Sequence, residues 1–194
     1  MRKSIAIIGE GETEWFYFES LRIARHYPFK LSPGFPQHAD IEHILKLAKA
    51  KLAEHYDYVV CLIDMDRLYE KQAEMQKYQS FKNRKENRDI MFIETSPCTE
   101  FWFLLHFLPD NTLRRFQNYD QLIPELRKYM PGYEKTKHYF IRTKLYDYLV
   151  ANGSLERAKS NAEKLSAMSK ALPDDRIAYS EIYKVIKLLD DLNQ

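Results

Sequence analysis

The chain of 194 residues is poor in glycine, with only 5, and two of these, Gly9 and Gly11, flank Glu10. It also has only 2 cysteines, Cys61 and Cys98, which are too few for the disulfide framework of a small secreted protein. The N-terminus shows no secretory segment. We therefore expect two reduced thiols in a cytoplasmic protein.

Long apolar runs are missing as well. The longest, residues 101–108, is interrupted by His106 and is far shorter than the roughly 20 residues that a membrane-spanning helix needs. A strong net charge is also missing, because 30 Lys and Arg against 28 Asp and Glu leave +2. That balance does not by itself indicate a nucleic-acid-binding protein. We expect no membrane partner, and local motifs must indicate the function.

Apolar and aromatic side chains are plentiful: 45% of the residues are hydrophobic, and there are 2 Trp, 14 Tyr and 11 Phe. This composition excludes a disordered chain. A chain of this length can bury one substantial core and is short for two independent domains. We expect one compact unit.

Strand and helix patterns alternate in the first part of the chain. Buried strands are predicted at residues 5–8, 29–31, 58–63 and 90–93, with a turn at residues 32–34. Helices are predicted at residues 15–24, 41–52 and 68–88, the last as one long polar helix. Such alternation is typical of an α/β fold with a parallel sheet and helices on both faces.

The pattern changes at Ser96, which we expect to cap a helix that has Pro97 at its first position and continues through residues 100–108. Beyond residue 109 we find no convincing strand. Helical patterns cover residues 119–129, 135–150, 154–171 and 180–192. The sequence thus predicts an α/β domain at residues 1–108 and a helical C-terminal extension at residues 109–194 packed on it.

Acidic residues follow two of the predicted strands: Glu10 after the first, and Asp64 and Asp66 after the strand at residues 58–63. Side chains two apart on a strand point to the same side, and the carboxyl ends of parallel strands meet at one edge of the sheet. The three carboxylates can therefore converge. They repel one another unless a cation lies between them, and Mg2+ is the natural candidate. The alternative is a set of solvated acids in loops.

Glu12 and Glu14 also lie in this stretch, at the start of the predicted helix. Acidic side chains are favourable there because they face the positive end of the helix dipole. Capping alone can explain both residues, whereas Glu10 has no such explanation.

The segments EGETE at residues 10–14 and DMD at residues 64–66 resemble the acidic signature of Toprim domains, the metal-binding α/β module of topoisomerases, primases and overcoming-lysogenization-defect nucleases. The chain is more closely similar to the RloB-like family, which is associated with bacterial phage-resistance loci. The hallmark of that family resembles TSPCTEFWFLLHF at residues 95–107, with GYEK later at residues 132–135. The sequence departs from the pattern at Ser96, where Asn is expected, and at Thr99, where an aromatic residue is expected.

The resemblance implies a Toprim-like sheet and a Mg2+-dependent or Mn2+-dependent nuclease that cleaves DNA or RNA in phage defence. By position, Glu10, Asp64 and Asp66 would be its catalytic and metal-binding residues, and Glu14 a further metal ligand. Glu10 would either share a second ion or act as a general acid or base. The sequence contains no P-loop, so any ATP hydrolysis would need an ATPase partner encoded elsewhere.

Glu100 and His106 belong to the hallmark helix, where they are six residues apart, so at most one can point to the site. His106 lies between apolar neighbours, and a hydrogen-bonded core histidine is the better interpretation. Glu100 is either a partner of the helix dipole or a group that holds a metal ligand in place.

Lys135, His138 and Arg142 recur on one face of the helix predicted at residues 135–150. Such a basic stripe can contact the phosphates of a nucleic acid, and a solvated helix face looks the same in sequence.

Two other functions remain open. One is a Toprim-derived module that binds nucleic acid or a partner without cutting. The other is a phosphotransferase with Asp64 as nucleophile, which is disfavoured because such a site usually follows the first strand.

Overall fold

A computed structural model describes residues 3–27, 29–31, 40–110 and 112–193 of the chain. In these ranges the sheet has the strand order β2-β1-β3-β4-β5, in which β1 to β4 are parallel and β5 is antiparallel to β4. The strands are β1 (Ile5–Ile8), β2 (Lys30–Leu31), β3 (Tyr58–Asp64), β4 (Ile90–Ser96) and β5 (Tyr179–Ser180). The predicted α/β fold is confirmed, while the turn predicted at residues 32–34 lies outside the described residues.

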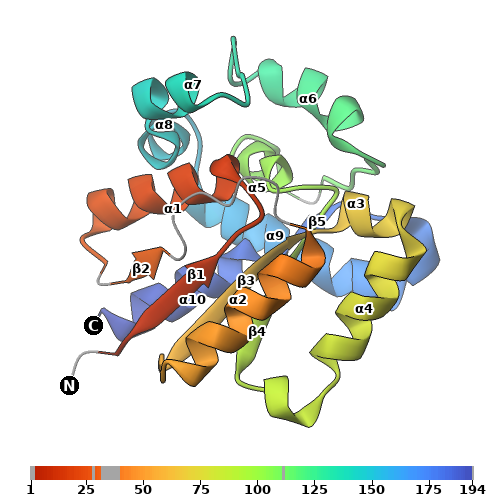
Figure 1. The fold of residues 1–194 in the computed structure, drawn as a ribbon. Helices are drawn as coiled ribbons and strands as arrows, with labels where there is room; N and C mark the ends of the chain where they lie inside the picture. The colour runs from red at the N-terminus through yellow and green to blue at the C-terminus, as the bar shows by residue number, and fades with distance from the viewer. Residues whose placement is uncertain (1–2, 28, 32–39, 111, 194) are drawn as a thin grey trace.

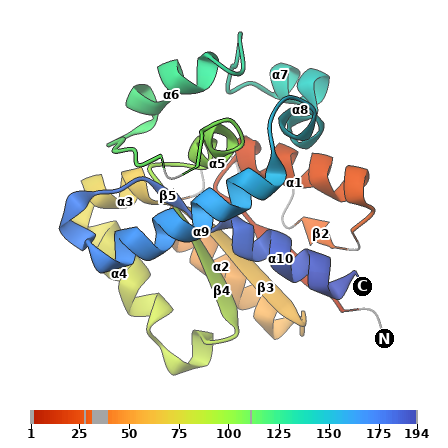
Figure 2. The ribbon, with the colours of Figure 1, turned by 180° about the vertical axis from the view of Figure 1, so that it is seen from behind.

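Helices cover both faces of the sheet (Figures 1 and 2). They are α1 (Glu12–Arg25), α2 (Ile41–Ala53), α3 (Met65–Glu70), α4 (Gln72–Lys82), α5 (Glu100–Leu105), α6 (Tyr119–Arg127), α7 (Lys137–Thr143), α8 (Leu145–Asn152), α9 (Leu155–Ala171) and α10 (Ile182–Leu192). Within the described ranges, none of these helices is long and apolar enough to cross a membrane.

Strand β3 shows why the sheet is buried on both sides. Val60 and Leu62 point into a hydrophobic cluster with α1, α5, α9 and α10. Val59, Cys61 and Ile63 point the other way, into a cluster with α2, α3 and α4. A continuous apolar run is what a central parallel strand needs, because both of its faces are covered.

The division of the chain at residue 108 stays a prediction. A single hydrophobic cluster includes side chains from both parts, among them Phe103 of α5 and Val185 of α10, each fully buried. The C-terminal helices therefore pack directly on the side chains that precede them.

Two predicted helices in the first part of the chain are wrong in their limits. The polar helix expected at residues 68–88 is broken at Lys71, which leaves the helical conformation (φ −120°, ψ 85°). The break lets α3 contact β4 while α4 packs against α2. Ser96 does not cap a helix, because it is the last residue of β4 and pairs with Tyr179, and Thr99 occupies the N-cap of α5.

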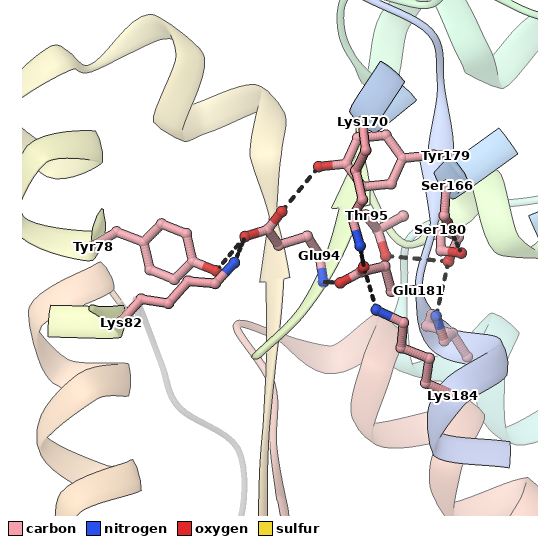
Figure 3. Close-up of polar contacts among 11 residues, drawn as sticks. Tyr78, Lys82, Glu94, Thr95, Ser166, Lys170, Tyr179, Ser180, Glu181 and Lys184 are labelled. Atoms are coloured by element: carbon pink, nitrogen blue, oxygen red, sulfur yellow. Dashed lines mark hydrogen bonds and ion pairs between the residues drawn. The ribbon is translucent and has the colours of Figure 1, made fainter. Parts of the chain in front are cut away.

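The expectation of no strand beyond residue 109 is also wrong, because β5 pairs with the end of β4. A two-residue strand shows no alternation that a sequence pattern could reveal. Side chains fix this pairing from both sides (Figure 3). The Glu94 carboxylate accepts hydrogen bonds from the hydroxyls of Tyr78 (2.6 Å) and Tyr179 (3.1 Å) and is paired with Lys82.

Glu181 completes this network next to β5. Its Oε1 forms ion pairs with Lys170 (3.0 Å) and Lys184, and its Oε2 accepts a hydrogen bond from the backbone N–H of Glu94 (3.3 Å). We call Glu94 and Glu181, with the lysines and tyrosines that bind them, the neutralised pair.

Candidate functional site

The turn between β1 and α1 places Glu10 against the end of β3. Glu10 Oε1 accepts a hydrogen bond from the backbone N–H of Asp64 at 3.1 Å. The turn is tight at Gly9, where an added Cβ would lie 2.8 Å from the Cβ of Glu14. Glu14 is itself buried, and its Oε2 accepts a hydrogen bond from the N–H of Gly11 at 3.0 Å. The structure therefore brings Glu10, Glu14 and Asp64 to one edge of the sheet.

Asp64 is the last residue of β3, and its carboxylate is held by the residue at the N-cap of α5. Asp64 Oδ1 accepts a hydrogen bond from the hydroxyl of Thr99 at 2.9 Å. Thr99 is one of the two positions at which the sequence departs from the family pattern. The hydroxyl at this position orients the Asp64 carboxylate by donating a hydrogen bond to it.

Asp66 is not on the strand that ends with Asp64, so the premise that both point the same way from one strand is wrong, although the charge of Asp66 still acts on Glu10. Helix α3 begins at Met65, so Asp66 is on a helix and the two-residue periodicity of a strand does not apply. Its Oδ1 accepts a hydrogen bond from the N–H of Arg67 at 2.6 Å. Asp66 lines a cavity of about 170 Å³ together with Tyr69, Glu70, Ser96, Phe116, Gln117, Asn118 and Arg176.

Glu100 is the residue of the hallmark helix that faces the acidic edge. It is fully buried, and its Oε1 accepts hydrogen bonds from Thr13 Oγ1 (3.3 Å) and Tyr133 Oη (3.0 Å). Lys135 Nζ lies 3.2 Å from the same oxygen. The other oxygen, Oε2, is buried without a hydrogen-bond partner among the described residues. Glu10, Glu14, Asp64 and Glu100 are called the acidic edge below.

His106 does not take part in this edge. Its ring is fully buried at an edge-to-face angle against Trp102, and its Nδ1 donates a hydrogen bond to the Trp102 carbonyl at 3.0 Å. Burial lowers the pKa of His106 to about 4. A neutral histidine in the core matches the better of the two interpretations drawn from the sequence.

The three residues of the predicted basic stripe are separated by the structure. Helix α7 begins at Lys137, after the N-cap Thr136, and ends before Lys144, which has a left-handed conformation (φ 51°). Lys135 thus lies in the loop before the helix, with its ammonium 5.3 Å from the centre of the Tyr119 ring. His138 and Arg142 are on α7 and exposed to solvent. The premise of one continuous helix face is wrong, and nucleic-acid contact by these residues stays a prediction.

The acidic edge holds more negative charge than its lysine balances. Burial, followed by repulsion from Glu14, raises the pKa of both Glu10 and Asp64. Burial likewise raises the pKa of Asp66. Burial acts to lower the pKa of Lys135, but the neighbouring carboxylates, Glu100 foremost, raise it overall. An added cation would therefore be stabilised at this edge.

The carboxylate oxygens of the acidic edge fit a hard divalent cation that takes only one or two of its ligands from the protein. Among the described residues no three Asp, Glu, His or Cys side chains are grouped to hold a metal. Mg2+ does not need such a cage, since it is usually bound by one or two carboxylates with water in the remaining positions. Glu10 and Asp64 are neighbouring carboxylates of this kind, because Glu10 contacts the backbone of Asp64 and its charge acts on the Asp64 carboxyl. Glu100, whose Oε2 has no hydrogen-bond partner among the described residues, also acts on the Asp64 carboxyl.

Sequence reasoning missed three hydroxyl groups that organise the edge: those of Thr13, Thr99 and Tyr133. Tyr133 lies in the GYEK segment, so the family resemblance did contain a signal for it. Thr13 and Thr99 also lie in segments that carry the resemblance, at residues 10–14 and 95–107, but their bonds to carboxylates 87 and 35 residues away become visible only when the chain is folded.

Comparison with known proteins gives one match. The sequence fits the family model described as RloB-like protein over residues 5–189. No curated protein and no solved structure matches the chain.

Proposed function

The chain belongs to the RloB-like family, and from its acidic edge we propose that it binds Mg2+ or Mn2+ and hydrolyses phosphodiester bonds of nucleic acid in phage defence. One observation carries the proposal: buried carboxylates gather where β1 and β3 end, with pKa values raised by burial and by one another. Edges of this kind bind ligands in open parallel sheets. Carboxylates that repel each other at such an edge favour a cation.

The residues of the edge have distinct roles in this proposal. Glu10 and Asp64 hold the cation, which when bound supplies positive charge to the phosphate and makes water more acidic. Water adds to phosphorus, the bond from phosphorus to the leaving oxygen breaks, and that oxygen takes up a proton. As the alternative to binding the cation, Glu10 can act as the general base that removes a proton from water. Thr99 orients Asp64 through their hydrogen bond.

A non-catalytic binding module is the second candidate. It is favoured by Lys135, which already places one positive charge against Glu100, and by the absence of a three-ligand group among the described residues. In this case the basic groups bind nucleic acid and no bond is cut.

Titration calorimetry with Mn2+ tests metal binding. Asp64→Asn keeps the size of the side chain and removes its charge, so we expect the affinity to fall at least about tenfold. The matched control is Glu163→Gln, which removes an equally sized charge from an exposed ion pair with Lys187 and should bind as wild type does. Equal Mn2+ affinity in wild type and Asp64→Asn would show that the metal assignment is wrong.

Cleavage assays separate the two candidates. Purified protein is incubated with single-stranded and double-stranded DNA and RNA in Mg2+, in Mn2+ or in EDTA. Metal-dependent cleavage supports the nuclease. Salt-dependent binding without cleavage of any substrate supports the binding module instead.

A further inference from the structure

A groove between α2 and α4 is a basic concave surface. It has a volume of about 550 Å³ and lies on the face of the sheet opposite α9 and α10 (Figures 1 and 2). It is lined by Glu42, Leu45, Lys46, Lys49, Ala73, Gln76, Lys77, Ser80, Phe81 and Arg84. Four of these side chains are cationic and one is acidic, although the whole chain has a net charge of only +2.

The cations of the groove are incompletely neutralised. Glu42 is shared by Lys46, at 3.5 Å, and Lys77, at 3.2 Å. Lys49 pairs with Glu86 at 3.3 Å. Within the part of the chain that the structure describes, Arg84 forms no ion pair. Positive charge therefore remains for an anionic ligand.

The two helices that flank the groove are linked at their starts to the acidic edge through Arg67. Arg67 on α3 interacts electrostatically with Glu10 at that edge and also with Asp40, the N-cap residue of α2. Its Nε lies 3.4 Å from Glu74 Oε2 on α4. Arg67 therefore connects the carboxylates to the start of both helices that form the groove. Lys77 lies in the middle of α4, and Arg84 follows shortly after the last residue of that helix, Lys82.

We propose that this groove binds the backbone of single-stranded nucleic acid. A concave surface between two packed helices accepts one strand, with phosphates on the lysines and arginine. Gln76 and Ser80 offer hydrogen bonds, and the partly buried Phe81 offers an apolar surface for bases. Binding of the strand by the groove does not depend on the proposed nuclease function. That function is needed only for the further claim that the bound strand places a phosphate at the acidic edge for cleavage.

Fluorescence anisotropy of labelled 20-nucleotide DNA and RNA single strands in EDTA tests the groove. The variant is Lys46→Gln/Lys77→Gln/Arg84→Gln. Each lost phosphate contact removes about 0.7 from the slope of log K against log salt, so we expect the slope to shrink by about 2. The affinity at 0.1 M salt should fall roughly tenfold or more. Circular dichroism checks that the variant is folded.

The matched control is Lys128→Gln/Arg157→Gln/Lys187→Gln, which removes the same charge from exposed positions just after α6, on α9 and on α10. It should keep the wild-type affinity and slope. Equal affinity in the groove variant and this control overturns the proposal, as does a wild type that binds no single strand. Binding of polyglutamate that depends on the groove, with no binding of nucleic acid, would mean an acidic protein partner and also overturns it.

Cleavage is measured separately in Mn2+, so the two proposals fail in different ways. If wild type binds the strand through the groove but never cuts it, the groove stands and the nuclease is wrong. If wild type cuts and the groove variant both binds and cuts as the control does, the nuclease stands and the groove is wrong.

Discussion

The sheet ends in two groups of carboxylates that differ in how their charge is balanced. In the neutralised pair, Glu94 and Glu181 are bound by three lysines and two tyrosine hydroxyls (Figure 3). In the acidic edge, four carboxylates share the ammonium of Lys135, which pairs with Glu100. Both groups are held by backbone and hydroxyl hydrogen bonds, so the difference lies in the number of cations.

The pKa values follow that difference. Burial acts to raise the pKa of Glu181, but hydrogen bonds from Lys184 and Lys170 lower it overall. Burial raises the pKa of Asp64, and neighbouring carboxylates raise it further. A carboxylate matched by lysines stabilises the fold, whereas a carboxylate kept among others costs stability and indicates a functional site. The comparison is consistent with a structural role for the neutralised pair and with the chemical role that we propose for the acidic edge.

The largest effect is expected for cleavage. Glu10→Gln should lower the rate at least about 100-fold, because it removes the charge next to Asp64 and the group suited to proton transfer. Glu94→Gln, in the neutralised pair, should cut at the wild-type rate. The measurement is the initial rate on the best substrate in saturating Mn2+. A Glu10→Gln protein as fast as wild type would contradict the assignment of the chemical role.

The next effect concerns stability. Glu181→Gln should lower the free energy of unfolding at pH 7 by about 1–2 kcal/mol, the typical value of hydrogen bonds to a charged group. Urea denaturation measures it, with the exposed Glu163→Gln as the control. The folded pKa of Glu181 is lowered from 4.5, so its contribution is present above pH 4.5 and disappears as the pH falls through the folded pKa. A difference that persists unchanged at pH 3 would contradict the charge-based explanation.

The acidic edge and much of the fold could be predicted from the sequence, because they depend on residues that are close together in the chain. The apolar run of β3 and the acids that follow it are adjacent in the chain, so the sheet edge with Glu10 and Asp64 was predictable. The same holds for α2, whose spacing of Ile41, Ile44 and Leu45 predicts the buried face that the structure shows.

The rest depends on contacts between distant segments. Asp66 was misplaced because nothing in DMD shows that the strand ends at the first aspartate. Lys135 was assigned to a helix face because local periodicity does not reveal the N-cap at Thr136. The neutralised pair was not predicted at all, since Glu94 and Tyr179 are 85 residues apart.

A smaller effect, on Mn2+ affinity, is expected at Thr99 and tests whether the hydroxyl groups of the acidic edge differ in role from those of the neutralised pair. Thr99→Val keeps the shape and removes the hydroxyl that donates to Asp64, so Mn2+ affinity should fall roughly tenfold while the fold is kept. Thr95→Val is the matched control, because Thr95 Oγ1 bonds Ser180 Oγ (3.3 Å) beside the neutralised pair. Calorimetry on both variants measures the difference. Equal Mn2+ affinity in the two variants would show that the hydroxyl does not orient the metal ligand.

The smallest expected effect is a gain in stability for Asp64→Asn, opposite in sign to the loss expected for Glu181→Gln. Asp64→Asn removes one of the repelling charges, so in EDTA at pH 8 its melting temperature should exceed that of wild type by roughly 2 °C. This shift corresponds to a gain of less than about 1 kcal/mol in the free energy of unfolding. The hydrogen bond from Thr99 remains possible to the amide oxygen. The pKa of Asp64 is higher in the folded state than its unfolded value of 3.8. Below pH 3.8 the group is protonated in both states and does not destabilise the fold. Above pH 3.8 the loss of folding free energy caused by its charge grows as the pH rises.

The gain of Asp64→Asn should therefore be larger at pH 8 than at pH 5, as measured by thermal denaturation. Saturating Mn2+ should raise the melting temperature of wild type above that of the variant, because the cation binds the folded wild type more tightly. Asp57→Asn is the control at the opposite edge of the sheet, where the carboxylate binds Lys3 and Ser4 and its pKa is lowered. That variant should be no more stable than wild type at either pH. A marked fall in the stability of Asp64→Asn in EDTA would instead place Asp64 with the structural carboxylates.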